Sequence, residues 1–201
     1  MRSAFGKWLA TVVMLVWILV GALLASAEEN VFKPFPVYTD ANSVDNHFTP
    51  SGWMGDFGAI QLDEAFTENP HSGTTCIKIV YTGASTQHQG WAGVYWQDPP
   101  NNWGSMPGGY DLTGAKRLTF WARGEMGGER CKFRIGGITG TYADSDRMQL
   151  GPITLSRDWQ LFTIPLHDAD LSSMSGGFCW IMNAVLNPQG GTIYVDDIRY
   201  E

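Results

Sequence analysis

The sequence predicts an all-β protein, an antiparallel β-sandwich or jelly roll. Short runs rich in Val, Ile, Thr and aromatic residues recur along the chain, several of them alternate between apolar and polar residues, and turn signals rich in Gly and Pro separate them. The 24 Gly residues are assigned to turns, because an apolar content of 44% is too high for a disordered chain. No segment after the N-terminal leader shows the apolar stripe of an amphipathic helix.

Residues 1–27 have the layout of a secretory signal peptide. Arg2 and Lys7 precede the apolar stretch 8–24, and Ala-Ser-Ala at 25–27 forms a small-x-small cleavage site. The alternative is an uncleaved membrane anchor, since about 20 apolar residues can span a bilayer. In both cases we expect the rest of the chain to be exported, to an extracellular or periplasmic space, with membrane contact only if the segment is not cleaved.

The charge of the chain bears on its partners. The formal net charge is −7, and removing Arg2 and Lys7 with the leader lowers it by two, to −9. Phosphate binding needs clustered Lys and Arg, so an acidic exported protein does not suit nucleic acid or an anionic membrane. On this argument a neutral partner or a cation fits better.

Residues 28–69 are predicted to be an irregular N-terminal segment that joins the domain, and residues 70–201 to be the β-sandwich. Within the irregular segment only GAIQLDEA at 58–65 alternates. Long irregular segments in compact domains are usually functional or flexible.

Seven runs have the composition of strands. They are residues 75–81, 91–97, 117–123, 131–137, 159–166, 178–185 and 192–200. The alternation is clear in the fourth run, where Cys131, Phe133 and Ile135 share one face and Lys132 and Arg134 share the other. A period of two residues is typical of a sheet with one buried face.

The run WAGVYWQ at 91–97 carries the main functional hypothesis. Its more apolar set consists of Ala92, Val94 and Trp96. Because that set predicts the core face, we expect Trp91, Tyr95 and Gln97 on the outer face, with Gly93 leaving a shallow groove between the rings. The alternative is that both faces are buried, since sandwich cores use aromatic residues freely.

Aromatic rings beside amides are typical of a sugar site, because the rings stack on the apolar face of a pyranose while the amides bond its hydroxyls. The Pro- and Asn-rich loop after the run supplies Asn102 and Trp103, and a further loop supplies Trp53 as one wall. The predicted ligand-binding residues are Trp91, Tyr95, Gln97, Asn102, Trp103 and Trp53.

The sequence has three cysteines, Cys76, Cys131 and Cys179, each within a strand-like run. An odd number in an exported protein allows at most one internal disulfide. We expect buried small apolar residues in preference to a bridge.

Several segments resemble known carbohydrate-binding modules. PHSGTTCIKIVY at 70–81 resembles their first-strand signature, and TIYVDDIRYE at 192–201 resembles their closing strand. The stretch 108–137 and the pair DWQLFTIPL and GGFCWIMN, at 158–166 and 176–183, are similar to the strands between. The resemblance implies a galactose-binding-domain-like jelly roll that binds glycans, has no catalytic residues and often holds a structural Ca²⁺ near the chain ends.

Asp196 and Asp197 lie side by side in an otherwise apolar strand. Their side chains are expected on opposite faces, so one faces inward and needs a partner or a metal. One alternative is an ion pair with Arg199 or Lys78. The resemblance implies a Ca²⁺ ion instead, with the ligands Asp196, Asp197, Asp63 and Glu64.

The sequence thus predicts a secreted, non-catalytic carbohydrate-binding protein. One alternative is a self-assembling or adhesive surface protein, since exposed strand edges and a free cysteine support association. The other is a glycan-active enzyme, which would need two carboxylates across a cleft. No G-x-S-x-G, H-E-x-x-H or Cys-His signature is present.

Overall fold

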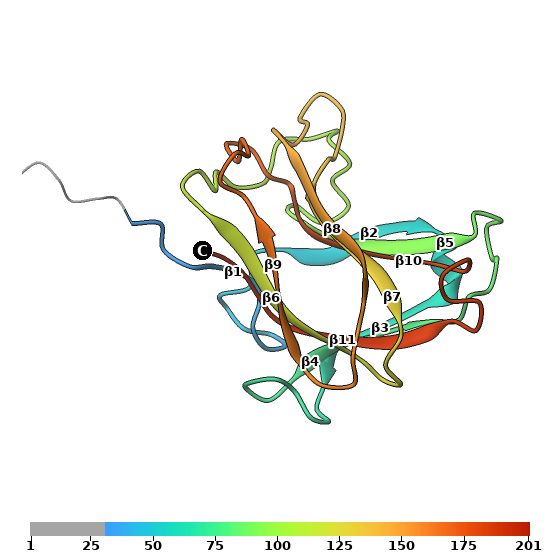
Figure 1. Ribbon diagram of the computed structural model, residues 1–201. Coiled ribbons are helices and arrows are strands. Elements are labelled where there is room, and N and C mark those ends of the chain that lie inside the picture. Colours follow the sequence, from blue (N-terminus) through green and yellow to red (C-terminus); the bar gives the residue numbers. More distant parts are fainter. Residues whose placement is uncertain (1–30) are drawn as a thin grey trace, which may run out of the picture. The chain divides into compact units, whose positions relative to one another are not determined.

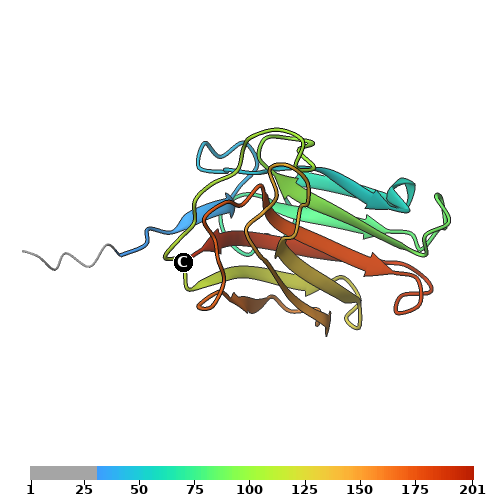
Figure 2. The same cartoon turned by 90° about the horizontal axis from the view of Figure 1, so that it is seen from above.

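The computed structural model of the protein describes residues 31–201, and two antiparallel sheets lie face to face in this stretch (Figures 1 and 2). The first sheet has the order β3 (Ile60–Phe66), β4 (Cys76–Tyr81), β11 (Gly191–Tyr200), β6 (Arg117–Gly124) and β9 (Gln160–Pro165), with β1 (Phe35–Tyr38) also paired to β11. The second sheet has the order β2 (Thr49–Gly55), β5 (Trp91–Gln97), β10 (Gly176–Asn183), β7 (Arg130–Gly136) and β8 (Arg147–Thr154). The prediction of an all-β antiparallel sandwich is confirmed.

Aromatic side chains from both sheets fill the space between them. The rings of Phe120 on β6 and Phe133 on β7 have centroids 4.4 Å apart, and Phe178 on β10 packs on both of them. Trp96 on β5 meets Phe178 edge-on at 5.5 Å. All four side chains are fully buried, so these rings form the core that holds the sheets together.

The seven predicted strands are all present, and the core face predicted for residues 91–97 is confirmed, but the opposite face is also buried from Gly93 to Gln97. Ala92, Val94 and Trp96 have no exposed surface. The side chain of Trp91 leaves the other face of β5 and is half-buried. Trp91 is therefore the aromatic residue of this run whose side chain remains accessible, on the outer face of the second sheet.

The prediction that residues 28–69 form an irregular segment outside the sandwich is wrong for most of its length, because β1, β2 and β3 belong to the two sheets. Strand β2 has the sequence TPSGWMG, whose Pro, Ser and Gly are typical of turns. Its pairing with β5 contains a register shift between Pro50 and Gly52, which removes the regular alternation. The strand β1 has only four residues, too few to show a period.

Strand β8 was also missed, because Gly151 and Pro152 interrupt its apolar pattern. It lies at the edge of the second sheet, where a strand tolerates Pro because one side of it has no partner strand.

All three cysteines are free and buried, as expected. Burial raises the pKa of the Cys76 thiol to about 12, which leaves almost no thiolate at neutral pH. The predicted signal peptide lies outside the described residues and stays a prediction. Within residues 31–201, no helix has the length and apolar character needed to cross a membrane.

Candidate functional site

The outer face of the second sheet carries a groove with a volume of about 710 Å³. It crosses β5, β10 and β7 and ends at the turn that follows β10. Its lining residues are Met54, Gly90, Trp91, Arg130, Cys131, Lys132, Arg134, Pro152, Ile181, Asn183, Val185 and Leu186. We refer to this set of residues as the groove.

Strand register brings the groove residues together from distant parts of the sequence. Trp91 on β5 lies opposite Asn183 on β10, which places an indole ring beside a carboxamide. One row further along, Ile181 lies opposite Gly93 on β5 and opposite Lys132 on β7. Directly opposed residues of antiparallel strands share a face, so these side chains all point outward.

Gly93 shapes the floor of the groove. A Cβ atom at this position would lie 2.7 Å from the carbonyl oxygen of Trp180 and 3.0 Å from the Cε of Met54. Met54 and Ile181 therefore close over Gly93 and form an apolar floor. The shallow gap between two exposed rings that the sequence predicts is in fact filled by these two side chains.

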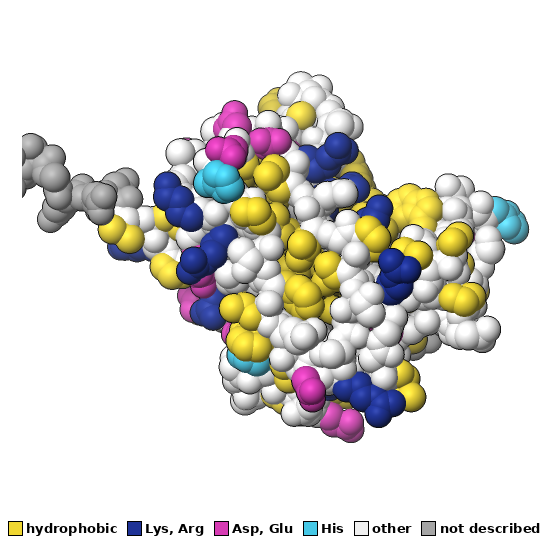
Figure 3. All heavy atoms as spheres, in the orientation of Figure 1, with side chains coloured by type: hydrophobic (Ala, Val, Ile, Leu, Met, Phe, Trp, Pro, Cys, Tyr) yellow, Lys and Arg dark blue, Asp and Glu magenta, His cyan; other side chains and the backbone are white. Residues whose placement is uncertain are grey.

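Three basic side chains form one wall. Arg130, Lys132 and Arg134 occupy alternate positions of β7 and face the groove, while Cys131 and Phe133 between them are buried. No Asp or Glu is among the lining residues. In Figure 3, several Lys and Arg side chains lie over β8 and β7, and the larger groups of Asp and Glu lie toward the margins of this view.

Of the predicted ligand-binding residues, the structure places Trp91 in the groove. It places Tyr95 beneath the 98–109 loop, which carries Trp103. Tyr95 is only 3% exposed, because its hydroxyl donates to the carbonyl oxygen of Gly136 at 2.8 Å and the Trp103 ring packs edge-on against it at 6.0 Å. The outward direction predicted for Tyr95 is right, but the loop makes it inaccessible.

Gln97 and Asn102 are fully buried, so the prediction that they contact a ligand is wrong. The Gln97 amide donates to the carbonyl oxygen of Asn102 and its oxygen accepts from the hydroxyl of Ser51. The Asn102 oxygen accepts from the backbone N–H of Gly104, and its amide donates to the carbonyl oxygen of Met106. Both amides hold the 98–109 loop, because buried polar groups must find partners inside the protein.

Trp103 and Trp53 are exposed, at 43% and 41%, but neither lines the groove. Trp53 lies opposite Val94, a core residue, whereas its neighbour Met54 lies opposite Gly93. Trp53 therefore leaves the inner side of the edge strand β2, on the other face of the sheet from Trp91.

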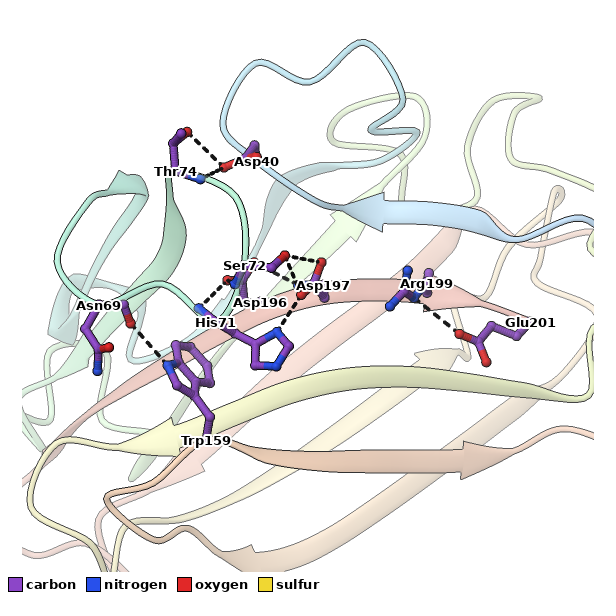
Figure 4. Close-up of polar contacts among 10 residues, drawn as sticks. All are labelled: Asp40, Asn69, His71, Ser72, Thr74, Trp159, Asp196, Asp197, Arg199 and Glu201. Carbon is purple, nitrogen blue, oxygen red and sulfur yellow. Dashed lines mark hydrogen bonds and ion pairs between the residues drawn. The ribbon is translucent and has the colours of Figure 1, made fainter.

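Apart from the groove, the adjacent carboxylates of Asp196 and Asp197 on β11 form a polar cluster with His71 and Ser72, shown in Figure 4. The backbone N–H of His71 donates to Asp196 at 2.8 Å. The Nδ1 of His71 contacts an oxygen of Asp197 at 2.7 Å, and the hydroxyl of Ser72 donates to both oxygens of Asp197. His71 in turn stacks on Trp121 at 3.8 Å, so the cluster fastens the 69–75 loop to the first sheet.

The expectation that Asp196 and Asp197 point to opposite faces is wrong. Asp197 has a φ of 49°, and the pairing of β11 with β6 shifts register between Asp196 and Arg199. This bulge turns both carboxylates toward the same loop. The carboxylates accept hydrogen bonds from the loop backbone, and Asp197 contacts the His71 ring. Neither Arg199 nor Lys78 is among the ion-pair partners of these two carboxylates within residues 31–201.

The arrangement does not fit a calcium ion. All four carboxylate oxygens of Asp196 and Asp197 already accept hydrogen bonds from the protein. Asp63 and Glu64 do not join them, since no three Asp, Glu, His or Cys side chains in residues 31–201 are grouped to hold a metal. The Ca²⁺ site that the resemblance implies would therefore require the 69–75 loop to rearrange.

Burial has an electrostatic consequence in the same cluster. It raises the pKa of Asp196 from 3.8 to about 6, the charge of Asp197 adds to the rise, and the backbone N–H of Ser72 opposes it. Asp196 is fully buried, so its negative charge is held in a place from which water is excluded.

Sequence reasoning missed the basic wall as part of a site. The alternation of Lys132 and Arg134 was visible, but the pairing of β10 between β5 and β7 was not. It is this non-local pairing that sets the basic side chains across the groove from Trp91.

The fold is a β-sandwich of the jelly-roll type seen in carbohydrate-binding modules. A family 30 carbohydrate-binding module is 18% identical, with 84% of this chain and 87% of that chain covered and a TM-score of 0.57. A family 30 module of a cellulosomal cellulase of Clostridium thermocellum is 17% identical, with 84% and 97% covered and a TM-score of 0.56. A family 11 module of another cellulosomal cellulase of Clostridium thermocellum is 14% identical, with 84% and 94% covered and a TM-score of 0.55.

At these identities the likeness shows a shared fold. Neither a protein-family model nor a curated protein matches the sequence.

Proposed function

We propose that the protein is exported and binds a carbohydrate chain in the groove without altering it. The observation that carries this proposal is the half-buried indole of Trp91 in a groove of about 710 Å³, beside the carboxamide of Asn183, on a sandwich that shares its fold with carbohydrate-binding modules.

The groove offers the two kinds of contact that a sugar needs. The Trp91 ring and the floor of Met54 and Ile181 provide apolar surface for the C–H face of a pyranose. Asn183 and the basic wall provide hydrogen-bond donors for the hydroxyl groups at the ring edge. A site of mostly apolar area with a few placed polar groups is typical of small-ligand binding.

A solved relative supports the choice of ligand class. A family 11 carbohydrate-binding module from Clostridium thermocellum, 16% identical with a TM-score of 0.50, was solved in complex with a β-1,3-1,4-mixed-linked tetrasaccharide. That ligand belongs to the relative, and for this chain we propose only the class, a glycan.

The composition of the groove favours binding over hydrolysis. Glycosidases in general use two carboxylic acids on either side of the scissile bond. No Asp or Glu is among the residues that line this groove. Asp56, one of the acids near it, is fully buried and accepts hydrogen bonds from the backbone N–H groups of Gln87, Gln89 and Gly90.

The test is affinity electrophoresis of the folded protein through gels that contain soluble polysaccharides, both neutral and acidic. We expect at least one polysaccharide to retard the wild type and Trp91→Ala to weaken that retardation about tenfold or more, because a stacked indole is a typical binding hot spot. Trp53→Ala is the matched control, since it removes an exposed indole on the other face of the sheet. If no polysaccharide retards the wild-type protein, the proposal is wrong.

A further inference from the structure

We propose that the preferred ligand of the groove is an acidic glycan, a chain that carries carboxylate or sulfate groups, and that the basic wall of β7 recognises these groups. This inference rests on the proposed function and narrows its ligand class.

The first argument is the geometry of the basic wall. Arg130, Lys132 and Arg134 lie on alternate residues of one strand and face the same groove. Alternate residues of a strand are separated by about 6.6 Å, so the wall extends over about 13 Å. An acidic polysaccharide carries its charged groups at regular intervals along the chain, so a row of basic side chains can pair with several of them.

The second argument is the absence of internal counter-charges. None of the ion pairs formed within residues 31–201 includes Arg130, Lys132 or Arg134. The nearest acid in sequence, Glu129, is buried and its carboxylate accepts from the backbone N–H of Met126. The charges of the wall are therefore free to pair with a ligand.

The third argument is an unsatisfied donor. The Nε of Arg134 is buried and has no hydrogen-bond acceptor among the described residues. Buried N–H groups are almost always paired in folded proteins, and a movement of the Arg134 side chain toward the groove would let an anion pair with this one. A guanidinium binds planar carboxylate and sulfate-like groups through two parallel hydrogen bonds, which suits the proposed anion.

The residues on the other side of the groove favour a glycan over a simple anion, because they offer surface for a sugar ring. Trp91 on β5 lies across β10 from the basic residues of β7, and together with Asn183 on β10 it can hold a sugar ring against the floor. The net charge of −7 led the sequence argument toward a neutral partner. Exposed charges are screened beyond about 8–10 Å at physiological salt, so most of the acids that give this net charge have little effect in the groove. The nearer carboxylates, those of Asp56 and Glu129, accept hydrogen bonds from backbone N–H groups.

The experiment compares polysaccharides that differ only in charge. Binding of the full-length mature protein is measured by titration calorimetry with polygalacturonate and with its fully methyl-esterified form, in which the same backbone has lost its carboxylates. κ-Carrageenan against its desulfated form provides the sulfate arm, and single-stranded DNA provides a polyanion without pyranose rings. Each titration is repeated at 20 mM and 300 mM NaCl.

We expect at least one charged chain to bind about tenfold or more tightly than its neutral counterpart at low salt, with the advantage reduced at high salt. Lys132→Gln and Arg134→Gln should each weaken binding of the charged chain about three- to tenfold and binding of a neutral chain by less, because Gln keeps a donor for hydroxyl groups and loses only the charge. Lys116→Gln is the control, because it removes an exposed lysine outside the groove. Thermal melts of each variant verify that it is folded.

Three results overturn the inference. Equal affinity for charged and neutral chains, lost in Trp91→Ala, would leave the proposed function intact and show that the basic wall does not select the ligand. Binding of single-stranded DNA as tight as that of the charged glycan would show a general polyanion site. No binding to any chain by the folded protein would contradict the proposed function and the inference together.

Discussion

Asp196 provides a test of the electrostatics of the polar cluster. Asp196→Asn removes a buried negative charge and keeps nearly the same shape. Because burial raises the pKa of Asp196 from 3.8 to about 6, the folded state binds a proton more tightly than the unfolded state. The stability that this group contributes is therefore fully present below about pH 4 and is lost as the pH rises through 6.

The magnitude follows from the shift. About two pKa units, at 1.36 kcal/mol per unit, correspond to roughly 3 kcal/mol in all, most of which the wild type loses between pH 4 and pH 7.5. The Asp196→Asn variant does not lose this stability as the pH rises, because its side chain does not ionise. The hydrogen bonds with His71 and Ser72 that the amide fails to make lower stability over the whole pH range. The pH dependence of the difference therefore reports the buried charge together with its coupling to Asp197.

The assay is urea unfolding of both proteins in EDTA at several pH values from 4 to 7.5. We expect the free energy of unfolding of Asp196→Asn, minus that of the wild type, to rise with pH by about 2–3 kcal/mol. Glu68→Gln, which removes an exposed carboxylate, should show no such rise. A difference that falls with pH would mean that the ionised carboxylate is stabilised in the folded state, and the reasoning would be refuted.

Further predictions concern the core, the thiols and calcium. Phe178→Ala should lower the free energy of unfolding, measured by urea denaturation, by about 3–5 kcal/mol, because it empties part of the core. Leu161→Ala, at an exposed position, should change it by less than about 1 kcal/mol, and equal effects of the two variants would contradict the core described. A thiol reagent should label Cys76, Cys131 and Cys179 only after unfolding, and rapid labelling of the native protein would show that they are accessible. EDTA should leave the melting midpoint unchanged, and a lower midpoint restored by Ca²⁺ would show that the loop at Asp196 does rearrange to bind the ion.

Much of the fold could be predicted from the sequence, because its signals are local. The run at 91–97 shows its core face in the identity of alternate residues, and burial of Ala92, Val94 and Trp96 confirms it. The strands that were missed lack this signal, since β2 contains Pro and Gly and β8 is interrupted by Pro152. Their place is fixed by hydrogen bonds to partner strands, which sequence patterns do not show.

The site was predictable only in part, for the same reason. Trp91 could be found, because its direction follows from the alternation of its own strand. The burial of Tyr95 depends on how the loop carrying Trp103 folds back, and no local pattern determines this. The approach of Lys132 to the groove depends on β10 lying between β5 and β7. The convergence of Asp196 and Asp197 depends on one positive φ angle.

The central claim is that a carbohydrate lies against Trp91 on the outer face of the second sheet. The most direct measurement is a nuclear magnetic resonance titration of the tryptophan indole N–H signals with oligosaccharides prepared from a polysaccharide that retards the protein. Trp159 packs edge-on against His71 beside the polar cluster of the first sheet, away from the groove. The account predicts that the Trp91 signal shifts progressively while those of Trp53 and Trp159 stay in place. Shifts at Trp53 or Trp159 with an unchanged Trp91 signal would contradict it.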